Sequence, residues 1–215
     1  MIALSLNEVE TLAAKVGRGA GLPWGLAEEL SRGARRLAEA GLPWADALAV
    51  LAEGCSSWAP PSPARVAAWR ARRDEPSGES LLCPLRLAIF LMDDPAILAA
   101  GALSVERVAA PIWLAGVLAP ARGEPGYRVD WDGVAFETYA CGVARIAGDG
   151  DALAPRARVT IAPLAGDRVA APPRGRAEID AATLPALSAV AERTYVAASE
   201  TSRVRGAGGG SVDDD

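Results

Sequence analysis

The spacing of the apolar residues changes near Gly126, and this change most limits the folds open to the chain. Before Gly126, apolar residues recur every three or four positions, which is the period of amphipathic helices. After it, residues 127–139 alternate apolar and polar side chains around Asp132-Gly133, a pair typical of a two-residue hairpin turn. We therefore expect an α+β protein, in which a helical N-terminal half packs on a small antiparallel β-meander and a C-terminal helix leads into a polar, Gly-rich tail.

A helix is expected close to the start of the chain. Ser5 and Glu8 have the spacing of a capping box, in which the serine and the glutamate three residues later each satisfy a backbone N–H of the other. Apolar residues follow at helical intervals, so this helix should end at Gly17 or Gly19.

The tetrapeptide Gly-Leu-Pro-Trp occurs twice, at residues 21–24 and 41–44. In each copy a glycine is suited to ending one helix, and a proline to opening the next. The repeat predicts a helical hairpin that Trp24 and Trp44 staple together.

The same criteria predict the later helices and strands. A further helix is expected to begin at Ser104, whereas residues 112–118 are compatible with helix or strand. A last helix should be capped at Thr183. We expect residues 1–120 to form a helical region and residues 121–215 to hold the sheet, the last helix and the tail, in one compact unit.

The absence of histidine excludes Ser-His-Asp and Cys-His catalysis and His-containing zinc sites. The three cysteines, Cys55, Cys83 and Cys141, lie too far apart for a CxxC metal pair and do not form a disulfide framework. Cys83 is surrounded by apolar residues and is expected to be a buried thiol. No metal site and no cofactor are predicted.

Charge and hydropathy limit the possible partners. The net charge of −5 argues against nucleic acid, because counterion release from phosphates favours basic proteins. The basic stretch at residues 64–73 is therefore expected to be a solvated helix face with salt bridges; its side chains are Arg65, Trp69, Arg70, Arg72 and Arg73. The longest apolar stretch, residues 108–121, is shorter than the ~20 residues that span a bilayer. We expect no membrane contact and a cytoplasmic location.

The polar segment after the last predicted helix is the main candidate site. An arginine can hold a carboxylate or phosphate through its planar fork, and glycines let backbone N–H groups approach an anion. A solvated terminus without a site is the alternative. The residues expected to bind a ligand are Thr194, Thr201, Ser202, Arg203, Gly206 and Gly208, and those expected to act in catalysis are Tyr195, Ser199 and Glu200.

Four stretches form a recognisable pattern: residues 5–8, residues 18–29 (RGAGLPWGLAEE), residues 131–134, and residues 194–203 (TYVAASETSR) with the Gly-Ala-Gly run that follows. In these stretches the chain resembles a bacterial family of proteins of similar length, classed only as a domain of unknown function. The resemblance implies that the tail belongs to the protein. It implies no activity, fold or cofactor.

Three functions remain open. The favoured one is an accessory or structural subunit, which docks on a protein partner such as a catabolic enzyme or forms a homo-oligomer. The second is a small-molecule enzyme that acts on an anionic substrate in a site formed by the tail. The third is a binding module for a small acidic ligand. The missing histidine and the Trp-rich helical half favour the first.

Overall fold

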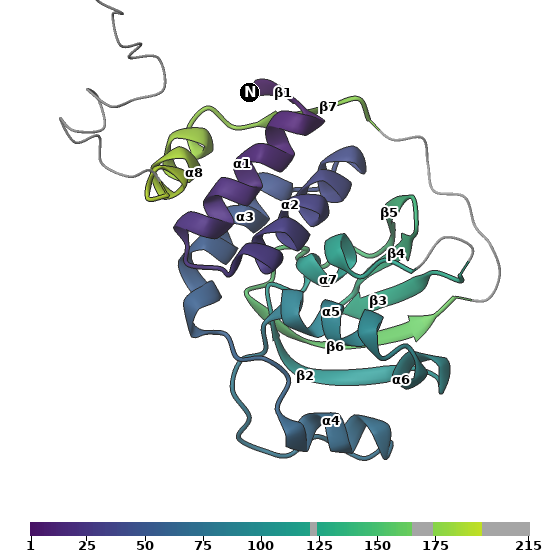
Figure 1. Cartoon of the computed structure of the whole chain (residues 1–215). Coiled ribbons are helices and arrows are strands. Elements are labelled where there is room, and N and C mark those ends of the chain that lie inside the picture. Colours follow the sequence, from purple (N-terminus) through teal and green to yellow (C-terminus); the bar gives the residue numbers. More distant parts are fainter. Residues whose placement is uncertain (121–123, 165–173, 195–215) are drawn as a thin grey trace, which may run out of the picture.

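A computed structural model describes residues 1–120, 124–164 and 174–194. A layer of helices covers a five-stranded antiparallel sheet, and a two-stranded sheet lies at the far end of the helical layer (Figure 1). The predicted α+β architecture is confirmed. The helices are α1 Leu6–Gly19, α2 Trp24–Glu39, α3 Trp44–Gly54, the 3₁₀ turn η1 Cys55–Ser57, α4 Pro63–Arg70, α5 Pro84–Asp93, α6 Ala96–Ala99, α7 Ile112–Val117 and α8 Thr183–Glu192. The strands are β1 Ile2–Ser5, β2 Leu103–Ala109, β3 Tyr127–Trp131, β4 Val134–Tyr139, β5 Gly142–Ala147, β6 Arg156–Pro163 and β7 Arg176–Ile179.

The first helix begins with the predicted capping box. The hydroxyl of Ser5 accepts the backbone N–H of Glu8 at 3.2 Å, and the backbone N–H of Ser5 donates to the Glu8 carboxylate at 2.7 Å. The hydrogen bonds from the backbone and hydroxyl of Ser5 lower the pKa of Glu8, because they stabilise its charged form. Helix α1 ends at Gly19, as the sequence predicts.

Residues 112–118, which the sequence left open between helix and strand, are mostly helix α7. Helix α2 packs on α5 and α7, and α7 packs on β4 and β5, so α7 lies between the helical layer and the sheet. Trp113 is fully buried, and its Nε1 donates to the carbonyl of Ala47 at 3.2 Å. A helix that is buried on all sides has no polar face, and therefore no amphipathic period that the sequence could reveal.

The five-stranded sheet has the order β2-β6-β3-β4-β5. Strands β3, β4 and β5 follow one another as a meander, and β6 then returns to pair with β3, which completes a Greek key. Asp132 and Gly133 have positive φ values of 37° and 79°, as a type I′ turn between β3 and β4 requires. The predicted hairpin is confirmed, and Trp131 stacks on Phe136 with ring centroids 5.3 Å apart.

The predicted helix at Ser104 is wrong, because Ser104 belongs to strand β2. Leu103 and Val105 are buried and pair with β6, while Ser104 between them is exposed. The register shifts after Val105, where Arg107 has a positive φ of 55°. Pairing with a strand distant in the sequence overrides the local helix signal here.

Strand β1 and helix α1 both contact elements from the last part of the described chain. Strand β1 pairs antiparallel with β7, and α8 packs on α1. Helix α8 starts at the predicted residue, but Thr183 is not its cap: Ala182 is the N-cap, and no side chain caps the helix. The packing of α8 brings Thr194, which follows it, next to α1 and α2.

Candidate functional site

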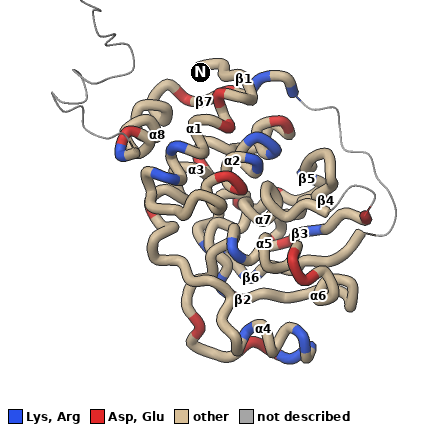
Figure 2. Tube along the Cα trace, viewed as in Figure 1, with Lys and Arg blue, Asp and Glu red and all other residues tan. Residues whose placement is uncertain are grey.

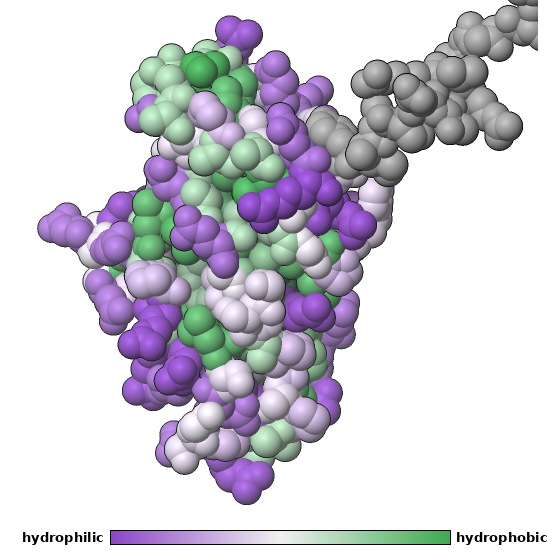
Figure 3. Space-filling model, turned by 90° about the vertical axis from the view of Figure 1, so that its left-hand side faces the viewer, coloured by the Kyte–Doolittle hydropathy of each residue, from purple (hydrophilic) through white to green (hydrophobic). Residues whose placement is uncertain are grey.

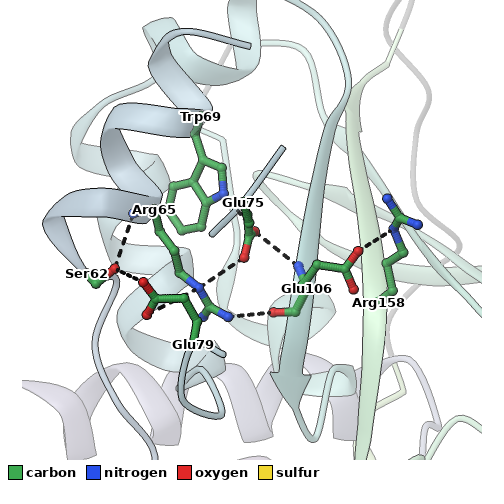
Figure 4. Close-up of polar contacts among 7 residues, drawn as sticks. All are labelled: Ser62, Arg65, Trp69, Glu75, Glu79, Glu106 and Arg158. Atoms are coloured by element: carbon green, nitrogen blue, oxygen red, sulfur yellow. Dashed lines mark hydrogen bonds and ion pairs between the residues drawn. The ribbon is translucent and has the colours of Figure 1, made fainter. Parts of the chain in front are cut away.

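A buried ionic cluster joins α4 to β2 (Figure 4). The side chain of Arg65 is 1% exposed, and its Nε lies 3.0 Å from Oε2 of Glu75, which is 3% exposed. This contact is an ion pair without hydrogen-bond geometry. Arg65 Nη2 donates to the backbone carbonyl of Glu106 at 3.2 Å, and Glu79 lies 4.0 Å from Arg65 Nε. The predicted solvated face is therefore wrong for Arg65, and also for Trp69, which is 1% exposed.

The carboxylate of Glu75 ties this cluster to the backbone of β2. Its Oε1 accepts hydrogen bonds from Trp69 Nε1 at 2.8 Å and from the backbone N–H of Glu106 at 3.1 Å. The side chain of Glu106 turns the other way, toward Arg158 on β6, at 3.0 Å (Figure 4). Because Arg65 and Glu75 attach α4 and the segment after it to β2, and Glu106 joins β2 to β6, we interpret the cluster as a structural clamp.

The three thiols differ in exposure. Cys55 and Cys83 are buried, as predicted for Cys83, and burial raises the pKa of both thiols. Cys141 is exposed. A raised pKa reduces the thiolate fraction, so neither buried thiol has the properties of a nucleophile.

One thiol in each folded chain is therefore expected to react quickly with an aromatic disulfide reagent that releases a coloured thiolate. That thiol is Cys141, while Cys55 and Cys83 should react only after unfolding in guanidinium. The absorbance change before and after unfolding measures both groups, and Cys141→Ser should remove the fast phase. A fast phase that survives this substitution would contradict the assignment.

A hollow of about 550 Å³ lies where α1, α2 and the end of α8 meet. We name it the Trp24 hollow. Basic residues at the ends of α1 and α8 lie on the same side of the molecule (Figure 2). Hydrophilic residues surround apolar patches when the molecule is viewed from that side (Figure 3). Of the side chains that line the Trp24 hollow, three are cationic and one is anionic. Its lining residues are Ala14, Lys15, Arg18, Trp24, Ala27, Glu28, Arg193 and Thr194.

Trp24 presents a large apolar ring to solvent in a fixed orientation. The residue is 69% exposed, and its Nε1 donates to Glu28 Oε1 at 2.8 Å. The guanidinium carbon of Arg18 lies 5.6 Å from the Trp24 ring centroid, within the range of a cation–π contact. Arg18 Nη1 in turn donates to the carbonyl of Leu22 at 2.8 Å. Glu28 thus holds the indole ring at its N–H edge, and Arg18 lies over the face of the ring.

The prediction that Trp24 and Trp44 together staple a helical hairpin is wrong for Trp24, whose ring faces solvent. Trp44 is only 2% exposed. It lines a separate hollow between the start of α3 and strand β7, beside Ala177 and Ile179. The two copies of Gly-Leu-Pro-Trp have the same sequence, but their backbones already differ at the proline, where ψ is 154° at Pro23 and 62° at Pro43.

Of the predicted site residues, Thr194 lies in the described part of the chain. It lines the Trp24 hollow, and its hydroxyl donates to the carbonyl of Ala191 at 2.8 Å. The others lie outside the described residues: Tyr195, Ser199, Glu200, Thr201, Ser202, Arg203, Gly206 and Gly208.

Sequence reasoning did not assign Lys15, Arg18, Trp24 and Arg193 to a site. A partial signal existed, because residues 18–29 and the stretch that Thr194 opens are two of the four that carry the family resemblance. The structure brings these two stretches together at one hollow.

A family model described as "Protein of unknown function (DUF3726)" matches residues 4–77. The predicted resemblance to a domain of unknown function is confirmed. The matched segment contains Arg18 and Trp24 but not Arg193 or Thr194. No curated protein and no solved structure matches the chain.

Two further findings concern metals and membranes. In residues 1–120, 124–164 and 174–194, no group of three or more His, Cys, Asp and Glu side chains is placed to hold a metal ion. None of the helices in these ranges is long and apolar enough to cross a bilayer.

Proposed function

We propose that this protein is an accessory binding subunit that docks an acidic segment of a partner protein in the Trp24 hollow. The observation that supports this most directly is the 69% exposure of a tryptophan whose orientation is fixed by Arg18 and Glu28. Tryptophan and arginine are enriched among the residues that contribute most to protein–protein binding. A ring fixed before binding also loses little conformational entropy when a partner covers it.

The local charge supports an acidic partner. Lys15, Arg18 and Arg193 line the hollow with Glu28 as the one acidic side chain, whereas the whole chain has a net charge of −5. The hollow is therefore a local reversal of the overall charge. Such complementarity accelerates encounter with an acidic segment and selects against basic ones.

The high exposure of Trp24 favours a protein partner over a small ligand. Pockets for small molecules enclose most of the ligand between apolar walls. A ring that is 69% exposed instead resembles a side chain on an uncovered interface, where the partner supplies the remaining walls.

The alternative is a small-molecule site, enzymatic or purely binding, that Tyr195, Ser199, Glu200 and Arg203 would complete. Its supporting observation is that Thr194 lines the hollow, so the next residue begins there. Calorimetry with small carboxylates and phosphates separates the alternatives. An enzyme should turn over its substrate, and this turnover should end when residues 195–215 are removed. A binding module should release or absorb heat on binding without forming product. The proposed subunit should show neither binding heat nor turnover with these small molecules.

In extract of its source cells, the native protein is expected to elute from a sizing column with a larger partner, and Trp24→Ala is expected to elute alone. Loss of a central interface tryptophan weakens binding by about 2 kcal/mol or more, which is roughly 30-fold in Kd. The partner, identified from the shared peak and purified, permits direct measurement of Kd.

Arg70→Ala is the matched control, because Arg70 is an exposed arginine on the distant helix α4. It should leave co-elution unchanged, while Arg18→Ala should weaken binding as Trp24→Ala does. A native protein that always elutes as a lone monomer, or a Trp24→Ala variant that binds normally, would remove the proposal.

A further inference from the structure

We infer that residues 195–215 of this chain occupy the Trp24 hollow when no partner is bound, and that the partner must displace them. This inference rests on the proposed function for its competition step. Its physical basis is separate: the position of Thr194, the charges of the hollow, and the length and charge of the chain that follows.

The first step is proximity. Thr194 lines the hollow, so the following 21 residues start at the site itself. A segment tethered beside its own binding surface has an effective concentration in the millimolar range. Even a weak contact is therefore occupied much of the time.

The second step is charge. The segment contains Glu200 and closes with Asp213, Asp214 and Asp215. Its two arginines, at 203 and 205, lie between these acidic positions, so the last residues form an acidic end. This is the chemistry that Lys15, Arg18 and Arg193 favour.

The third step is reach. Asp213 follows Thr194 by 19 positions, and a stretch of that length can span up to roughly 60 Å when extended. The Gly-rich stretch at residues 206–210 permits a reversal of direction. The acidic end can therefore return to the hollow from which the segment departs.

A second hollow, of about 430 Å³, offers an extended path. It lies between α1 and α8 and shares Lys15 with the Trp24 hollow. Together the two hollows follow one side of α1, which suits an extended peptide better than a compact ligand. The side chains of the second hollow are Asn7, Glu8, Thr11, Leu12, Lys15, Ser188, Ala191 and Glu192. Two of them are acidic and one is basic, so the acidic end of the segment is assigned to the Trp24 hollow and not to this one.

The tryptophan exposures provide a specific readout. Trp24 is 69% exposed, whereas the other five tryptophans are at most 9% exposed. Acrylamide quenching therefore reports mainly on Trp24. If the segment covers the ring, the full chain resists quenching and the variant without residues 195–215 does not.

The test compares the full chain, the variant that ends at Thr194, and full chains with Asp213, Asp214 and Asp215 changed to asparagine. Truncation should increase quenching clearly, and the asparagine variant partly. A synthetic peptide of residues 195–215, added to the truncated protein, should restore protection, and molar salt should remove it. In Trp24→Phe the difference between full and truncated chains should disappear.

Partner affinity gives the second readout. If the segment occupies the hollow about nine-tenths of the time, its removal strengthens partner binding roughly tenfold. Circular dichroism of the truncated protein checks that the fold remains. Equal quenching of full and truncated chains overturns the inference, and so does protection that appears only at concentrations where the chain dimerises.

The two proposals fail differently. Unchanged quenching together with Trp24-dependent partner binding removes the inference and leaves the proposed function. Increased quenching on truncation, with no binding that depends on Trp24, removes the proposed function and leaves the contact between the segment and the hollow.

Discussion

Arg65→Ala is expected to lower the free energy of unfolding by about 3–5 kcal/mol, because it leaves a buried carboxylate without its ionic partner. The side chain of Glu75 is 3% exposed, and its Oε2 lies 3.0 Å from Arg65 Nε. The substitution also removes the hydrogen bond from Arg65 to the Glu106 carbonyl and leaves a cavity. Urea denaturation followed by circular dichroism measures the change.

The matched control is Arg70→Ala on the same helix. The side chain of Arg70 is 61% exposed and pairs with Asp94 at 2.7 Å, so its loss should change stability by only about 0–1 kcal/mol. If Arg65→Ala does not fold, Arg65→Met combined with Glu75→Leu should, since replacing both charges leaves neither one unpaired. Equal effects of the two alanine variants would contradict the clamp.

Gly19→Ala is expected to separate α8 from α1. A Cβ at this position would lie 1.9 Å from the carbonyl oxygen of Val190, which belongs to the backbone of α8 and cannot rotate away. We expect a loss of about 1–3 kcal/mol, as for other overpacked contacts. The loss should be concentrated in α8, where hydrogen exchange of the backbone amides should accelerate more than in α2.

Gly25→Ala provides the comparison, because the position is helical and the added methyl group would have no atom within 4 Å other than those of its chain neighbours and its own helix backbone. It should stabilise the protein by about 0.4–1 kcal/mol. If Gly19→Ala leaves the amides of α8 as protected as in the native protein, the packing of α8 on α1 is wrong. Quenching of Trp24 in the same variant shows whether the hollow depends on α8.

The sequence predicts those features that depend on neighbouring residues. Ser5 and Glu8 form a capping box within one turn of helix, and Asp132-Gly133 forms its turn without help from distant segments. In both cases the hydrogen bonds or φ values involve residues at most three positions apart, so the residue types determine the geometry.

Features set by distant contacts were not predictable. Ser104 lies in a strand because β6 pairs with it, and α7 shows no helical period because it is buried on all sides. Arg65 can be buried because Glu75 neutralises its charge and the Glu106 carbonyl of β2 accepts a hydrogen bond from its guanidinium group. The site has the same limitation: Thr194 and Trp24 share a hollow only because α8 returns to α1.

The pairing of β1 with β7, and of α1 with α8, has a consequence for synthesis on the ribosome. The matched segment, residues 4–77, is translated early but lacks the two elements that complete its outer strand and first helix. Those elements emerge only with residues 176–192. The nascent chain therefore leaves one side of α1 uncovered until residues 176–192 have been synthesised, so chaperone engagement should persist at least until then.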